Sequence, residues 1–254
     1  MPLRFPTASH SRHSTRPNRL SRLGFESLER RNLLAAAIWD GGGGDSKWST
    51  PANWVGDLVP AQNDDVTIND SRTIEVLYDL DSQLTLASLD TSESIKLISG
   101  GVTVTDTTLF AANTQLTVQQ GAEFEALGAT TVDTVNLVAT SGGKLSLPGV
   151  TSYTNKNTND NDRYLRADGA GSKLSLPNVT SIASSVDRAD ELIIQARYGG
   201  TVEIGTDVSE TVVPSGAVQF DADGGTEALA SLIDLPNLTS FTGYMNASTA
   251  GFFP

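Results

Sequence analysis

The sequence predicts an all-β fold, a right-handed parallel β-helix with coils of about 29 residues. The first observation behind this prediction is a thirteen-residue phrase that recurs in the second half of the chain. It reads GGKLSLPGVTSYT at Gly142–Thr154, GSKLSLPNVTSIA at Gly171–Ala183 and SLIDLPNLTSFTG at Ser231–Gly243, with a weaker copy at Gly200–Val212. The second is that apolar and polar residues alternate within each copy, as in a strand with one buried face. Such repeats bury their apolar faces only against neighbouring repeats, which indicates a solenoid.

Each coil is expected to contain three short strands. One precedes the glycine pair, one follows it, and a third starts after Pro148, Pro177 and Pro236, because proline cannot donate to a β ladder. The strands of the phrase align Leu145 with residues 29, 57 and 88 positions later, and counting back 29 positions reaches Leu116. We therefore predict one column of inward aliphatic residues, the core column: Leu116, Val118, Leu145, Leu147, Leu174, Leu176, Val202, Ile204, Ile233 and Leu235.

A leucine-rich-repeat solenoid is the alternative fold. Apolar residues three positions apart, such as Leu176, Val179 and Ile182, keep the spacing of that repeat, and its unit of about 20–29 residues is close to the observed period. The segments rich in Thr and Val favour strands over helices, so the β-helix is preferred.

The repeats, assigned to residues 71–254, need protection at their ends. Residues 38–70 contain four consecutive glycines and all three tryptophans, Trp39, Trp48 and Trp54, which we expect to pack as an apolar cap over the first coil. This segment resembles the opening of many bacterial exported β-solenoid proteins; the alternative is an aromatic platform for sugars. No polar capping element follows the last phrase, so we expect either end-to-end self-association or further repeats beyond Pro254.

Charge is distributed unevenly along the chain. Residues 1–31 hold seven of the 17 basic residues and two of the 30 acidic ones, so this segment carries +5 and the remainder −18. The acidic body repels nucleic acid, which is therefore not an expected partner. No segment approaches the ~20 apolar residues of a transmembrane helix, so no membrane span is expected.

Residues 1–37 are interpreted as a basic, disordered leader that directs export. The stretch FESLERRNLLAA within it resembles the N-terminal motif of large exported planctomycete surface proteins, whose core reads roughly LExRxLLSA. The resemblance covers about a dozen residues and implies localisation at the cell surface or outside the cell. The matching residues are Leu28, Glu29, Arg30, Arg31, Leu33, Leu34 and Ala35.

Few residues of the body can support catalysis. The chain has no cysteine, and both histidines, His10 and His13, lie in the leader, so triads and zinc motifs that need His or Cys are excluded from the body. Carboxylates alone suffice for glycoside cleavage, which keeps a polysaccharide lyase or hydrolase as an alternative. Its groove would lie beside the polar segment Asn155–Asp168, and its walls would contain Arg163, Arg166, Asp168, Asp190 and Arg197.

No cofactor is expected, and weak Ca²⁺ binding is the one metal alternative. Asn157, Asn159 and Asn161 imitate the start of an EF-hand loop, but Asp162 stands where that loop needs glycine. The sequence thus predicts an exported surface or extracellular protein, structural or adhesive and without catalytic activity. A carbohydrate-active β-helix and a calcium-stabilised adhesin are the alternatives. The expected partners are cell-wall or matrix polysaccharide or other surface proteins.

Overall fold

The computed structural model describes residues 36–186, 188–208, 213–224, 230–239, 244–247 and 251–252. Over these residues the chain forms twenty-two β-strands and two short 3₁₀ segments, η1 (Pro51–Asn53) and η2 (Arg188–Asp190), and no α-helix. The all-β prediction is therefore confirmed for this part of the chain. The export-motif residues lie outside the described residues: Leu28, Glu29, Arg30, Arg31, Leu33, Leu34 and Ala35.

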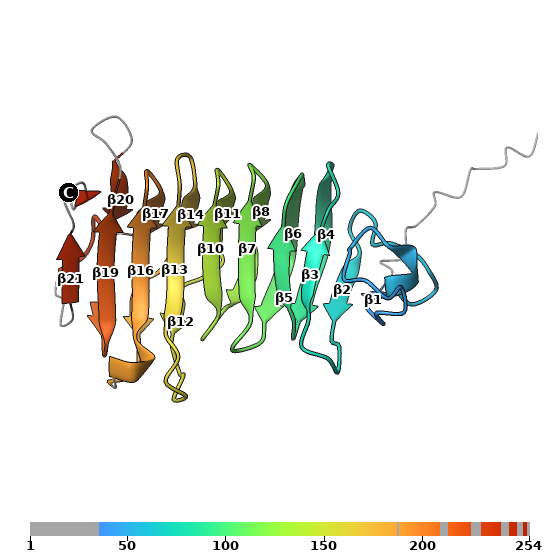
Figure 1. Ribbon diagram of the computed structural model, residues 1–254, viewed down its shortest axis with the longest axis horizontal. Coiled ribbons are helices and arrows are strands. Elements are labelled where there is room, and N and C mark those ends of the chain that lie inside the picture. The colour runs from blue at the N-terminus through green and yellow to red at the C-terminus, as the bar shows by residue number, and fades with distance from the viewer. Residues whose placement is uncertain are drawn as a thin grey trace, which may run out of the picture. The chain divides into compact units, whose positions relative to one another are not determined.

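The strands form three parallel sheets, in which neighbours come from successive repeats (Figure 1). The eleven-stranded sheet runs in the order β1 (Ala36–Ile38), β2 (Asp65–Ile68), β4 (Gln83–Thr91), β6 (Gly101–Phe110), β8 (Glu123–Ala126), β11 (Lys144–Ser146), β14 (Lys173–Leu176), β17 (Thr201–Ile204), β20 (Ser231–Asp234) and β22 (Gly251–Phe252), with β9 (Ala129–Thr131) beside β6. The eight-stranded sheet runs β3 (Glu75–Tyr78), β5 (Ser94–Leu97), β7 (Gln115–Gln119), β10 (Asn136–Thr140), β13 (Arg163–Asp168), β16 (Leu192–Arg197), β19 (Val218–Asp223) and β21 (Tyr244–Ala247). The three-stranded sheet contains β12 (Ser152–Thr154), β15 (Ser181–Ala183) and β18 (Val213–Ser215).

The predicted core column is confirmed in the second half of the chain. Leu145, Leu174, Val202 and Ile233 are direct partners in β11, β14, β17 and β20, and all four are buried. The residues two positions further on continue the buried face, with Leu147, Leu176 and Ile204 buried and Leu235 half-buried. Strands from distant repeats thus align as their shared phrase predicts.

The column is wrong for Leu116 and Val118. Both are buried, but they lie in β7 of the eight-stranded sheet, where Leu116 pairs with Leu137 and Ile95. The partner that precedes Leu145 is Phe124, only 21 residues earlier. The repeat is shorter in the first half of the chain, so a step of 29 residues passes the true partner and reaches a strand of another sheet with the same alternation.

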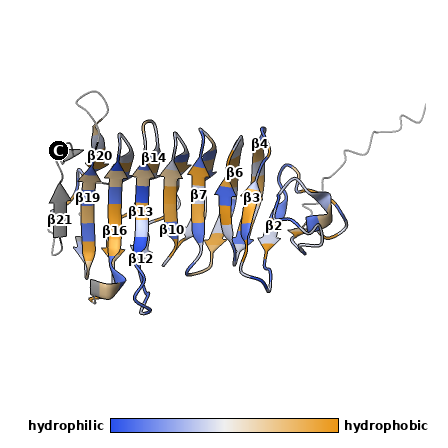
Figure 2. Ribbon diagram, in the orientation of Figure 1, coloured by the Kyte–Doolittle hydropathy of each residue, from blue (hydrophilic) through white to orange (hydrophobic). Residues whose placement is uncertain are grey.

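The longer repeats begin between β11 and β13. In the eight-stranded sheet, Leu137 pairs with a residue 21 positions earlier and with Leu165, 28 positions later. The added residues form the corner after Pro148, the strand β12 and a connection of residues 155–162, which is hydrophilic (Figure 2). β12 and β15 confirm the short strands that were predicted after Pro148 and Pro177.

The three tryptophans pack together near the start of the stack. All three are buried, and the ring centroids of Trp39 and Trp48 lie 5.1 and 4.8 Å from that of Trp54. Trp48 also lies 5.3 Å from Tyr78 of β3, which joins this cluster to the first repeat. Because the rings are covered, they cannot present the alternative sugar platform. β2, from the predicted cap segment, is a strand of the eleven-stranded sheet, and so is β1, whose first two residues belong to the segment interpreted as the leader.

Asp45 holds the loop between Trp39 and Trp48 in place. Its carboxylate accepts hydrogen bonds from the main-chain N–H of Lys47, from Asn53 Nδ2 and from Thr50 Oγ1. These bonds stabilise the charged form and hold the pKa of Asp45 below its usual value. A polar loop therefore fixes the apolar cluster without disulfides.

Candidate binding surface

Three neighbouring strands, β13, β16 and β19, expose an unusual set of charged side chains on their outer face. Within β13, Leu165 and Ala167 point into the core and are buried, so Arg166 and Asp168 must stand on the outside. The register places Arg166 opposite Gln195 and Asp168 opposite Arg197 of β16. In β19, Asp221 follows opposite Gln195, and Asp223 opposite Arg197. One row across the face therefore reads Asp168, Arg197 and Asp223, and the next reads Arg166, Gln195 and Asp221. We call its central part the Arg–Tyr face: Tyr164, Arg166, Asp168, Gln195, Arg197 and Tyr198.

Two tyrosines support the two arginines. The guanidinium carbon of Arg166 lies 4.3 Å from the ring centroid of Tyr164, and that of Arg197 lies 5.2 Å from the ring centroid of Tyr198. The attraction between a cation and a ring face favours keeping each guanidinium group beside its tyrosine. The five ion pairs found among the described residues include neither Arg166 nor Arg197.

Gln195 is the centre of this face. Only 8% of it is exposed, although it points outward, because its neighbours cover it. Its Nε2 donates to Asp221 Oδ2 at 2.6 Å, whereas its Oε1 has no hydrogen-bond partner among the described residues. The Nε atoms of Arg166 and Arg197 are likewise covered and without a partner there. The face therefore holds one acceptor and two donors that no group in the described ranges satisfies, which is uncommon for buried polar atoms.

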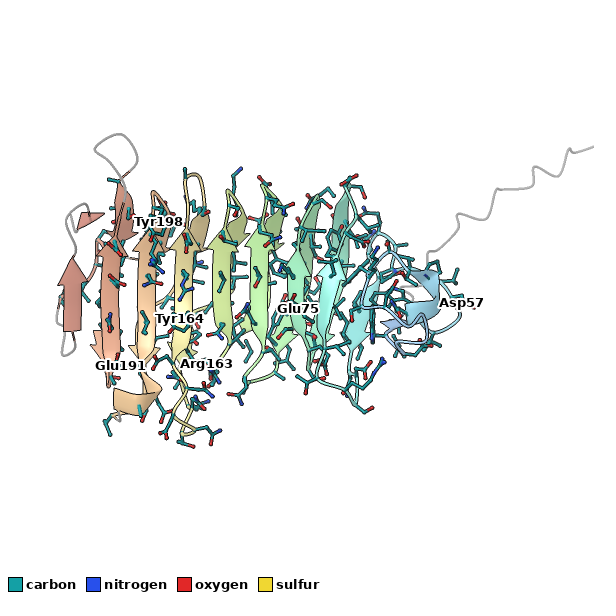
Figure 3. All side chains as sticks on the ribbon, viewed as in Figure 1. Asp57, Glu75, Arg163, Tyr164, Glu191 and Tyr198 are labelled. Carbon is teal, nitrogen blue, oxygen red and sulfur yellow. The ribbon has the colours of Figure 1, made fainter. Side chains whose placement is uncertain are left out.

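The structure divides the predicted groove. Arg166, Asp168 and Arg197 share the Arg–Tyr face, but Arg163 and Asp190 do not. Arg163 has the same strand parity as Leu165, so its side chain points inward, whereas its neighbour Tyr164 points outward (Figure 3). A groove that contains all five residues is therefore wrong.

Arg163 and Asp190 organise the connections between strands. The Arg163 guanidinium donates to Thr134 O at 3.1 Å, to Asp162 O at 3.0 Å and to Asn113 Oδ1. Asp190 is buried, and its carboxylate accepts the main-chain N–H of Asn161 at 3.2 Å. Both side chains are used inside the molecule and are not available to a substrate.

A separate hollow of about 360 Å³ lies where the longer connection passes over the shorter repeat. Its wall includes Asn113, Thr131 and the ion pair between Lys156 Nζ and Asp133 Oδ2, at 2.9 Å. The hollow is open, and the ion pair uses two of its charged groups.

Of the predicted calcium residues, Asn157 uses its side chain within the same connection. The Asn157 side chain donates to Asn161 O, and the side chain of Asn155 donates to Asp190 O at 2.9 Å. In the part of the chain that the structure describes, no group of three or more His, Cys, Asp or Glu residues is placed to hold a metal ion.

The sequence prediction missed Tyr164, Gln195 and Tyr198. The available signal was the alternation in RYLRAD and LIIQAR, which places every second residue on one face. What it lacked was the register between β13 and β16, which brings the two segments side by side.

None of the helical segments in the described ranges is long and apolar enough to cross a membrane. Comparison of the chain with protein-family models, with curated proteins and with solved structures finds no match.

Proposed function

We propose that this chain is an exported, non-enzymatic protein of the cell surface or extracellular space that serves as a structural or adhesive module. In this proposal the sheets close into a right-handed parallel β-helix with three strands per coil. The observation that carries it is the stack of in-register parallel strands, which buries a continuous aliphatic core and exposes broad polar sheet faces. Such an array is rigid and long relative to its width, which suits a spacer or a scaffold.

The fold and the charge of the body support this role. The several parallel sheets, without an α-helix among the described residues, fit a β-helix better than a leucine-rich repeat. The charge of −18 outside the leader favours solubility and disfavours contact with nucleic acid. The division of the predicted groove also favours a binding role over the alternative lyase or hydrolase, because two of its five polar groups are used internally.

Export is supported by the leader motif and is tested on the full chain with a C-terminal epitope in a planctomycete host. We expect the epitope to be accessible on intact cells to antibody and to added protease. Replacing Leu33 and Leu34 by Asp removes the apolar part of the motif, so the protein should stay inside. The neighbouring change Asn32→Asp is the matched control and should leave exposure unchanged. Retention of the unaltered chain inside the cell would contradict the proposal.

A further inference from the structure

We propose that the Arg–Tyr face binds an uncharged, hydroxyl-rich polysaccharide that lies across β13 and β16. The inference rests on the proposed adhesive function and names its ligand and site. It follows from three observations: donors and acceptors on adjacent strands, polar side chains that are already oriented, and the exposed aromatic ring.

The donors and acceptors suit adjacent hydroxyl groups of a sugar. Arg197 of β16 presents planar N–H donors directly opposite the carboxylate of Asp168 in β13. In the neighbouring row, Arg166 and Asp221 lie on either side of Gln195. Strands in a sheet are about 4.8 Å apart, so a donor and an acceptor from adjacent strands lie within reach of one sugar unit. A hydroxyl accepts from a guanidinium and donates to a carboxylate, so neighbouring hydroxyls satisfy both groups.

The polar atoms of the face are held in place before a ligand arrives. The hydrogen bond from Gln195 to Asp221 and the stacking of Arg166 on Tyr164 restrict these side chains. The ligand would meet the outer atoms of these side chains, because Gln195 Oε1 and the Nε atoms of both arginines are covered. Groups that are already oriented lose little entropy on binding, which favours affinity for a matching ligand.

Tyr198 adds an apolar surface at the end of the face. Its side chain is 54% exposed and lies beside Arg197, whose Nη2 is 3.4 Å from the Tyr198 hydroxyl. An exposed tyrosine ring packs against the C–H face of a sugar, as it packs in other wet interfaces. The aromatic and charged groups therefore serve different parts of the same ligand.

Charge selects an uncharged ligand over an anionic one. Asp168, Asp221 and Asp223 outnumber the two arginines across the three strands, and the body around them carries −18. A polyanion would be repelled on approach, and its carboxylates would meet the aspartates. Neutral hydroxyl groups avoid this repulsion and can still hydrogen-bond to both the guanidinium groups and the carboxylates.

The test uses the full chain with dextran, galactomannan and a soluble β-glucan as neutral probes, polygalacturonate as the anionic probe and chitosan oligomers as the cationic probe. Affinity electrophoresis and calorimetry measure binding. We expect at least one neutral polymer to bind. Arg166→Ala and Tyr198→Ala should each weaken it about tenfold, the effect of losing one good contact.

The matched control is Lys96→Ala, on the outer face of β5 in the same sheet but remote in the stack, and it should bind as the unaltered chain does. Tyr198→Ala removes an exposed ring, so an unchanged melting temperature separates lost binding from lost folding.

Three results would overturn the inference: binding to no neutral polymer, binding to polygalacturonate or chitosan alone, or neutral binding that survives both substitutions. If the chain is exposed on cells but binds nothing, the ligand assignment fails and the surface role stands. If neutral polymer binds at the face and new reducing ends appear, the site stands and the non-enzymatic role fails.

Discussion

At the residue scale, two tyrosines of the core point their hydroxyl groups at main-chain carbonyls. Tyr153 donates to Val135 O at 2.9 Å, and Tyr78 is placed to donate to Gly101 O at 3.1 Å and Ser82 O at 3.2 Å. Burial raises the pKa of both phenols, and in Tyr78 the charge of Asp79 adds to the effect and raises the pKa to about 12. The interior therefore tolerates these groups only in the neutral form.

Replacing Tyr78 by Phe should have an effect that depends on pH. Near neutral pH the variant loses the hydrogen bond from the buried phenol, so its free energy of unfolding should fall by about 1–2 kcal/mol. The folded pKa of Tyr78 lies above the unfolded value of 10.0, so the stability tied to its protonated form is full below pH 10 and is lost as the pH rises toward about 12. The difference in free energy of unfolding between the unaltered protein and the variant should therefore narrow as the pH rises from 10 toward about 12. Urea unfolding at a series of pH values measures it, and a constant difference would refute the account.

At the element scale, the corner that follows the strand of each repeated phrase explains why one position of the phrase varies between copies. The residue directly after Leu-Pro is Gly149 in one copy and Asn178 in the next. A Cβ on Gly149 would lie 1.6 Å from Gly128 O, so the close approach of this corner to the preceding one requires glycine. In the following repeat, Asn178 Nδ2 donates to Pro148 O at 2.8 Å, and Asn237 donates in the same way to Gly205 O at 2.9 Å. Asparagine thus links the corners of the longer repeats.

Gly149→Ala should destabilise the protein by about 3 kcal/mol, because two main-chain segments must separate to admit the methyl group. Gly121→Asn is a suitable control: φ at Gly121 is +76°, which asparagine tolerates, and a Cβ there meets no atom within 4 Å. This control should cost less than about 1 kcal/mol. Chemical unfolding of both variants measures the contrast, and equal losses would show that the corner is not tightly packed.

The alternation of side chains along a strand predicts which face a residue lies on, but not which residues it contacts. Arg163 and Arg166 are three residues apart and so lie on opposite faces of β13, one buried and one outside. Alternation in the sequence was enough to make this distinction. The partners of Arg163 could not be inferred in the same way, because Asn113 lies fifty residues earlier and reaches it only through the stacking of repeats.

At the scale of the whole molecule, contacts between strands run mainly from each repeat to the next. The order of the eight-stranded sheet follows the chain from β3 to β21 without interruption. In such an array stability is close to a sum of terms for repeats and for their interfaces with neighbours. A defect in one repeat should therefore weaken its neighbours first.

Leu174→Ala tests this locality. Removing a buried leucine should cost about 2–5 kcal/mol, and amide hydrogen exchange should accelerate in β14 and in its partners β11 and β17. Exchange in β2, at the far end of the same sheet, should change little. Ser146→Ala, on the outer face of β11, is the control and should leave exchange unaltered. A uniform increase along the chain would indicate one cooperative unit and contradict the prediction.

The sequence by itself determined the all-β class, the short strands after Pro148 and Pro177 and the aligned core from Leu145 to Ile233, because alternation and proline act locally and the phrase repeats at a nearly constant step. Only the tertiary structure decided that Phe124, and not Leu116, precedes Leu145, and that Tyr164 and Gln195 join Arg166 on one face. The physical reason is that alternation is the same in every sheet and does not report the length of the turns between strands. Register across repeats depends on how those turns pack, and the candidate site is a product of that register.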